Sequence, residues 1–158
     1  MKKILNLSVL ILLFSISAWG QETNTKPTCE NPIGAWKNDS GSTLAIDTLD
    51  TATGKITGTY TSPSGGGSSS YPLIGWVNDA IVDSEDLCKT CKTNNAKVIS
   101  FTVRWGSIGS ITSWTGKCQK NENGDPVIKT LWNLVRPNTN YDWDHILTGS
   151  DNFYPSSN

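Results

Sequence analysis

Hydrophobic and polar residues alternate over short segments between residues 34 and 153, and glycine, proline, asparagine and serine separate these segments. Alternation with a period of two is typical of β-strands that turn one face to a core. The pattern predicts eight strands, near residues 34–38, 42–48, 54–62, 71–77, 97–106, 111–119, 127–136 and 143–153. No segment keeps a helical period, and residues 82–93 are expected to form a long loop.

Most links between the predicted strands are of hairpin length, which favours an antiparallel meander of consecutive neighbours. Closing eight such strands into a barrel removes both sheet edges. A barrel of this size has an interior that side chains fill or that holds one small ligand. We therefore expect an all-β fold, an eight-stranded antiparallel up-and-down β-barrel over residues 33–154, with a tail at 155–158.

The N-terminal segment has a different character. Its basic start, its apolar run and the small residues Ala18 and Gly20 are typical of a secretory signal peptide, cleaved near Gly20. An uncleaved membrane anchor is the alternative, but the run is short for a span of about 20 apolar residues. Residues 21–32 are polar, contain two prolines and are predicted to form a flexible leader. The expected location is therefore secreted or periplasmic.

Net charge and tryptophan content reduce the number of possible functions. Removing the two lysines of the predicted signal peptide leaves 11 basic residues against 14 acidic ones, a net charge of about −3. This balance provides no electrostatic footprint for nucleic acid or an anionic membrane. Six of the seven tryptophans lie beyond the signal peptide. Because tryptophan offers a flat apolar wall, we expect some of them to line a cavity.

All four cysteines, Cys29, Cys88, Cys91 and Cys118, lie in the part predicted to be exported. Disulfides are the usual state of exported cysteines, and four cysteines allow three pairings. Cys88 and Cys91 form a CxxC motif that also occurs in zinc and redox sites. The chain has one histidine and no second CxxC, so a local disulfide is favoured and no metal site is predicted.

Two polar stretches have alternative interpretations. The sequence GAWKNDSGS at 34–42 fits a plain hairpin turn, but Asn38 and Ser42 could instead face a cavity and hold a polar group. The glycine-rich link at 62–70 is either an exposed connector or a loop over the mouth of the barrel.

Six segments taken together resemble the avidin and streptavidin family: GAWKNDSGS (34–42), GTYTS (58–62), FTVRW (101–105), SWTGKC (113–118), KTLWNL (129–134) and DWDHILTGSDNF (142–153). They follow the family order over nearly all of the expected mature chain. The resemblance implies an eight-stranded barrel with a biotin pocket at one end, no catalytic residue and no cofactor. Biotin or a biotinylated molecule is then the expected partner, and a homotetramer is favoured over a dimer.

The resemblance also implies how a urea-like group would be held. Asn38, Ser42 and Tyr60 match the donors to the ureido oxygen of biotin. Ser62 and Asp151 match the groups that accept from the two ureido N–H groups. Such a set satisfies every polar atom of a urea, and the carboxylate makes one of the hydrogen bonds charge-assisted.

Other positions match the walls and the tail of the family pocket. The apolar walls correspond to Trp105, Trp114, Trp132 and Leu134. Ser110 and Thr112 match positions near the carboxylate tail and the ring sulfur, and Trp143 matches the tryptophan that closes a neighbouring subunit's pocket. Ser40 and Ile108 depart from the family pattern, which puts the affinity in question more than the ligand.

For the cysteines, the resemblance implies a disulfide between Cys29 and Cys118, which leaves Cys88 to pair with Cys91.

Three other functions compete with biotin binding. They are a lipocalin-like carrier of another hydrophobic ligand, a small hydrolase that uses Asp142 or Asp151 with His145, and a structural barrel with a filled interior. The polar set matches a urea better than a lipid, and no serine or cysteine nucleophile pattern accompanies the histidine. Non-catalytic binding of biotin is therefore the favoured function.

Overall fold

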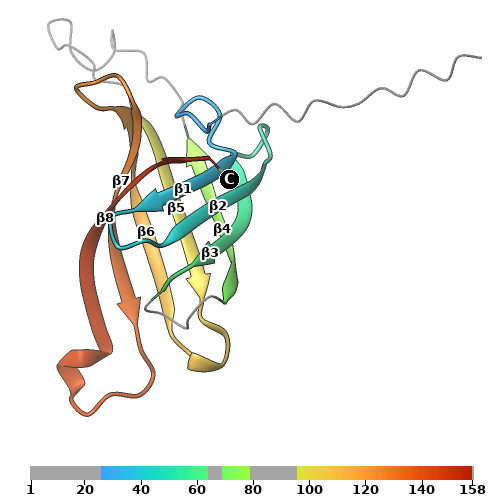
Figure 1. The fold of residues 1–158 in the computed structure, drawn as a ribbon. Helices are drawn as coiled ribbons and strands as arrows, with labels where there is room; N and C mark the ends of the chain where they lie inside the picture. The colour runs from blue at the N-terminus through green and yellow to red at the C-terminus, as the bar shows by residue number, and fades with distance from the viewer. Residues whose placement is uncertain (1–25, 64–68, 79–95, 158) are drawn as a thin grey trace, which may run out of the picture.

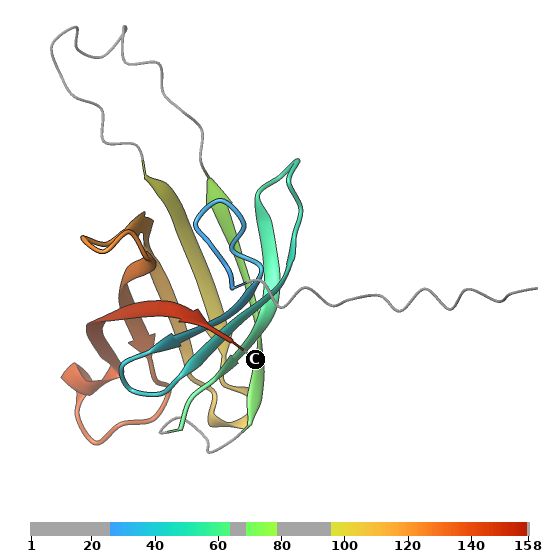
Figure 2. The ribbon, with the colours of Figure 1, turned by 45° about the horizontal axis from the view of Figure 1, so that its top comes forward.

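The computed structural model describes residues 26–63, 69–78 and 96–157. They form a closed barrel in which each strand pairs with the next and the last pairs with the first (Figure 1 and Figure 2). The strands are β1 Gly34–Asn38, β2 Thr43–Leu49, β3 Lys55–Thr61, β4 Ser70–Asn78, β5 Lys97–Arg104, β6 Ile111–Lys120, β7 Pro126–Val135 and β8 Ile146–Ser156, with 3-10 turns η1 Gly106–Ile108 and η2 Asp142–His145. The predicted fold class and all eight strands are confirmed.

Alternate residues of each strand face the interior, as the period of two predicts. In β5, for example, Ile99, Phe101 and Val103 are buried, whereas Val98 is exposed. The largest fully buried side chains are Trp36, Phe101, Phe153, Leu44, Ile46, Ile56, Ile128, Val103 and Val127. Their removal from water, at about 25 cal/mol per Å² of apolar surface, is the main contribution to barrel stability.

The two ends of the barrel differ in character. Strands β1, β3, β5 and β7 all end at one end, where β2, β4, β6 and β8 begin. This end, at the bottom of Figure 1, is called the open end below. Core residues Ile56 and Ile128 lie near the starts of β3 and β7, so the apolar core fills the opposite end.

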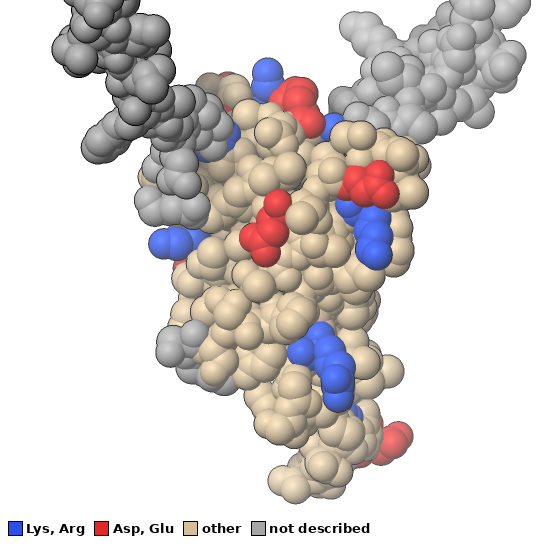
Figure 3. All heavy atoms as spheres, turned by 90° about the vertical axis from the view of Figure 1, so that its right-hand side faces the viewer, with Lys and Arg blue, Asp and Glu red and all other residues tan. Residues whose placement is uncertain are grey.

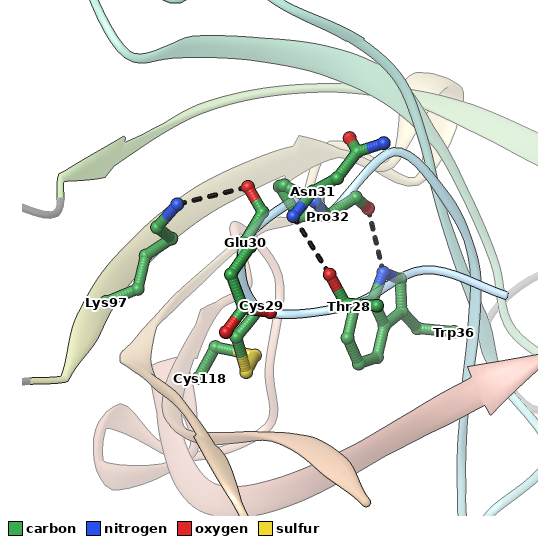
Figure 4. Close-up of a disulfide and its surroundings, with 8 residues drawn as sticks. All are labelled: Thr28, Cys29, Glu30, Asn31, Pro32, Trp36, Lys97 and Cys118. Atoms are coloured by element: carbon green, nitrogen blue, oxygen red, sulfur yellow. Dashed lines mark hydrogen bonds between the residues drawn. A yellow bond between two sulfur atoms is a disulfide. The ribbon is translucent and has the colours of Figure 1, made fainter.

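Residues 26–33 lie against the barrel at this opposite, closed end (Figure 4). A disulfide joins Cys29 to Cys118 of β6, as the family resemblance implies. The fully buried Trp36 donates from Nε1 to the carbonyl oxygen of Pro32 at 2.9 Å. The sequence predicts a flexible leader over residues 21–32, but its described part is fastened at these two points.

Several predictions lie outside the described residues: the signal peptide and its cleavage near Gly20, the loop at 82–93 with the Cys88–Cys91 disulfide, and most of the glycine-rich link at 62–70.

The predicted start of the last strand is wrong. Residues 142–145 form η2, and β8 begins at Ile146. The rings of Tyr141 and Trp143 stack with centroids 4.5 Å apart, closer than the roughly 6.6 Å between alternate residues of a strand. The strand also continues to Ser156, two residues into the predicted tail, because residues 153–156 pair with β1 to close the barrel.

The outer surface mixes charged and apolar side chains. On the face seen in Figure 3, basic and acidic residues are scattered among uncharged ones, without a basic patch of the kind that nucleic acid requires. Trp76 on β4 is 53% exposed. Within the described ranges, we find no helix with the length and apolar character of a membrane span.

Replacing Cys29 and Cys118 together by serine tests the role of the disulfide. It links residues 89 positions apart, so its loss should lower the free energy of unfolding by about 3 kcal/mol or more, which urea denaturation measures. A change of less than about 0.5 kcal/mol, as for an ordinary surface substitution, would show that the other contacts of residues 26–33 suffice.

Candidate binding site

A cavity of about 460 Å³ opens at the open end of the barrel, a volume suited to a small molecule. Its lining is Asn38, Ser40, Ser42, Tyr60, Ser62, Trp105, Ile108, Ser110, Thr112, Trp114, Trp132, Leu134, Arg136 and Asp151. The structure thus brings together all of the ligand-binding residues expected from the family resemblance, except Trp143.

The buried polar residues of the described chain gather on this cavity. Five of the six line it: Asn38, Ser42, Ser62, Ser110 and Thr112. Burying a polar group costs free energy unless it finds a hydrogen-bond partner. Across the described residues, no fully buried side-chain nitrogen or oxygen lacks one. So much polar surface at one end of an apolar barrel indicates a ligand with polar atoms of its own.

Asp151, on β8, is the centre of the polar network. Its Oδ1 accepts from Nδ2 of Asn38, and its Oδ2 accepts from Nε1 of Trp114, both at 2.9 Å. The Oδ1 of Asn38 in turn accepts from the backbone N–H of Ser42 at 2.8 Å, which fixes the orientation of the amide. A carboxylate has about four acceptor sites, so two donors leave capacity for a ligand N–H.

A tight turn positions two of these side chains. The backbone N–H of Asn38 donates to the carbonyl of Ser42 at 3.1 Å, and the N–H of Gly41 donates to the carbonyl of Asn38 at 3.0 Å. Gly41 has a φ of 82°, a conformation that glycine adopts without steric cost. The hairpin-turn and cavity interpretations of the sequence 34–42 are therefore both correct, because the turn places both polar residues on the cavity.

Tyr60, on β3, is buried among aromatic rings. Its ring centroid lies 4.8 Å from that of Trp114 and 5.8 Å from that of Trp105. Burial raises the pKa of Tyr60 from 10.0 to about 12; the Asp151 carboxylate adds to the increase and the Ser42 side chain opposes it. The phenol is therefore protonated at neutral pH and can donate a hydrogen bond.

The tryptophans on the cavity are held by specific contacts. Nε1 of Trp105 donates to Oγ1 of Thr112 at 2.7 Å, and Trp114 stacks on Phe101 with centroids 4.9 Å apart. Trp132 lies opposite Gly149, where a Cβ atom would come within 2.4 Å of its Cζ2. Glycine at this position leaves room for the indole to lie across β8.

Arg136 is a lining residue that the sequence reasoning missed. Inward positions of β7 alternate through Thr130, Trp132 and Leu134, and the next position in this series is Arg136, just beyond the strand. No family motif covers it, but it is the last residue of the strand predicted over 127–136, so the inward alternation of that strand is the signal that would have found it.

Trp143 and His145 lie in η2 and do not line the cavity of their own chain. Trp143 is 73% exposed. Nδ1 of His145 lies 2.7 Å from the backbone oxygen of Arg136 and donates to it, which fastens η2 to the end of β7. The histidine is therefore not placed with Asp151 as a hydrolase would require. Among the described residues, no group of His, Cys, Asp and Glu side chains is arranged to hold a metal ion.

Replacing Tyr60 by phenylalanine tests the environment of the phenol. Subtracting the alkaline absorbance titration of the variant from that of the parent should isolate one phenol with a pKa of about 12. The unfolded chain ionises first, so the stability that the neutral phenol provides is present below pH 10 and is lost as the pH rises to about 12. A difference curve centred near pH 10 would show that Tyr60 is solvated.

Replacing Gly149 by alanine should displace Trp132. Overpacking of this kind costs about 1–3 kcal/mol, measured by urea denaturation, and should change the tryptophan fluorescence. The matched control is the same alanine in a Trp132→Phe background, where the clash with the indole is relieved. An equal cost in both backgrounds would show that the indole is not the obstacle.

Comparison with known proteins identifies relatives of this fold and site. The family model described as Avidin family matches residues 26–156. Avidin-related protein 4/5 of Gallus gallus is 29% identical over 151 residues, covering 92% of this chain and 89% of that protein. Avidin of Gallus gallus is 33% identical over 110 residues, covering 68% and 64% respectively.

Solved structures give the same result. The crystal structure of Xenavidin matches with a TM-score of 0.61 and 28% identity, covering 80% of this chain and 98% of that one. The crystal structure of core-bradavidin matches with a TM-score of 0.57 and 31% identity, covering 77% and 97%. Since the family model spans nearly all of the barrel and the matched structures share its fold, the chain belongs to the avidin family.

Proposed function

We propose that this chain binds one biotin per subunit in the barrel cavity, without catalysing a reaction. Members of the avidin family are non-enzymatic biotin-binding proteins that carry no cofactor, so membership supports a biotin-binding barrel in general. The observation that carries the specific proposal is the Asp151 network, a buried arrangement of acceptors and donors suited to a urea.

The ureido oxygen would accept hydrogen bonds from three sides. Nδ2 of Asn38 carries two hydrogens: it donates one to Asp151, and the second is available to a ligand. The phenol of Tyr60 is protonated at neutral pH, and the hydroxyl of Ser42 is buried on the same cavity. Three donors to one oxygen stabilise negative charge that a urea oxygen carries in part.

The two ureido N–H groups would donate to Asp151 and Ser62. Asp151 contributes a charge-assisted hydrogen bond, which is stronger than one between neutral groups. Because Asn38 and Trp114 already hold the carboxylate in position, little conformational entropy is lost when the ligand arrives.

The apolar rings and the side chain of biotin would lie against the walls. Trp105, Trp114, Trp132 and Leu134 remove this surface from water at about 25 cal/mol per Å². The hydroxyl of Thr112 accepts from Trp105 and keeps its own hydrogen for the ring sulfur, and Ser110 would contact the tail. In a lipid carrier, five buried polar residues on the cavity would face an apolar ligand that offers them no hydrogen-bond partners.

The proposal extends to assembly and location. Trp143 is 73% exposed and precedes β8, where the exposed residues Ile111, Val135 and Ile146 pair side by side across β6, β7 and β8. Such a surface is typical of an interface. We propose a homotetramer in which Trp143 closes a neighbour's cavity, with a dimer as the alternative. Export after cleavage near Gly20, into the medium or a periplasm, agrees with the Cys29–Cys118 disulfide.

Titration calorimetry with biotin tests the proposal through Asp151→Ala. The parent should saturate at one biotin per chain, and the variant should bind about 10- to 100-fold more weakly, because it loses a hydrogen bond to a charged group. Glu122→Ala, an exposed acid in the turn at the closed end, is the matched control and should bind as the parent does. Absence of heat with the folded parent, or equal affinities for all three proteins, would contradict the proposal.

A further inference from the structure

Arg136 places a positive charge on the cavity at the opposite end from Asp151. These two are the charged residues of the lining described above. Asp151 pairs across β7–β8 with Thr130, and Arg136 lies six residues further along, on the same inward series. Arg136 therefore lies three inward steps nearer the open end than the residue that pairs with Asp151. The cavity therefore runs from an anion inside the barrel to a cation at the open end.

The guanidinium group is held in place by the protein. Nε and Nη2 of Arg136 donate to the backbone oxygen of Asp144, at 3.1 Å and 2.7 Å. The backbone N–H of Arg136 donates to the carbonyl of His145 at 2.9 Å. An arginine fixed in this way loses less conformational freedom on binding a ligand than a mobile side chain would.

Part of the guanidinium group stays available to a ligand. No hydrogen bond to the described residues uses Nη1, and the acceptor for Nε and Nη2 is an uncharged carbonyl. The carboxylate of Asp144 lies 3.7 Å from Nη2 and offsets some of the charge, which limits the strength of a second ion pair but leaves the N–H donors of Nη1 unused.

The other cavity-lining residues at the open end are neutral. Ile108 is half exposed and apolar, and Ser110 and Ser40 carry no charge. Arg136 is therefore the residue at this end of the lining that can distinguish a charged ligand tail from a neutral one.

We propose that Arg136 makes the cavity selective for ligands whose tail ends in a free carboxylate over the corresponding neutral amides. The inference rests on the proposed function, because it concerns the tail of a biotin whose urea lies at Asp151. A carboxylate accepts two N–H groups of a guanidinium in charge-assisted hydrogen bonds, whereas an amide offers one neutral oxygen. Free biotin is then favoured over biotin linked to a protein through an amide.

The test compares biotin with biotin primary amide by calorimetric titration. Arg136 is about one-third exposed, so the parent should prefer the acid about 3- to 10-fold. In Arg136→Gln this preference should fall to near unity because affinity for the acid decreases, while affinity for the amide is retained. Arg136→Lys should keep part of the preference. Arg104→Gln removes an exposed arginine at the end of β5 that does not line the cavity, and it should keep all of the preference.

Salt dependence in the parent protein provides a measurement that needs no variant. Raising ionic strength should weaken binding of the acid and leave that of the amide nearly unchanged, because screening acts on the ion pair. Equal affinities for the two ligands in the parent, a preference that survives in Arg136→Gln, or a preference insensitive to salt would each overturn the inference while leaving biotin binding intact. A parent protein that binds neither ligand would overturn the proposed function, and the inference with it.

Discussion

The carboxylate of Asp151 lies inside a barrel whose interior is otherwise uncharged up to the open end, so it depends on hydrogen-bond donors from other strands. Asn38 of β1 and Trp114 of β6 provide them. The Asn38 contact joins β8 to β1 across the seam where the barrel closes, and the Trp114 contact reaches β8 from β6. The site is therefore complete only when the barrel closes, because Asn38 reaches the carboxylate only when β1 pairs with β8.

The closed end makes this polar arrangement possible. Trp36 fills the interior there, and its N–H is satisfied by Pro32 in the segment that the disulfide holds. Two residues further along β1, Asn38 faces the cavity. The barrel interior therefore changes from an apolar core to a polar cavity between two successive inward-facing residues of β1. A site that is organised before the ligand arrives spends less free energy on ordering when the ligand binds.

The strands were predictable because their alternation is local, and most site residues because the family motifs cover them. The start of β8 was not predictable from the sequence, because Tyr141 and Trp143 alternate as strand residues do but stack in a turn. The end of β8 was not predictable either, because pairing with β1 determines where the strand ends. Arg136 was missed because the family motif on β7 stops at Leu134, although Arg136 continues the same inward series and lines the cavity. Of these misses, the end of β8 depends on pairing with a strand distant in sequence, whereas the start of β8 depends on a local turn.

Each polar atom of a bound urea has an expected partner on the cavity, so a crystal structure of the purified protein with biotin is the most direct test. The ureido oxygen should lie within hydrogen-bond distance, about 2.7–3.2 Å, of Asn38, Ser42 and Tyr60. One ureido nitrogen should lie equally close to Asp151. A biotin bound elsewhere, or bound in this cavity with its urea turned toward the open end, would contradict the account.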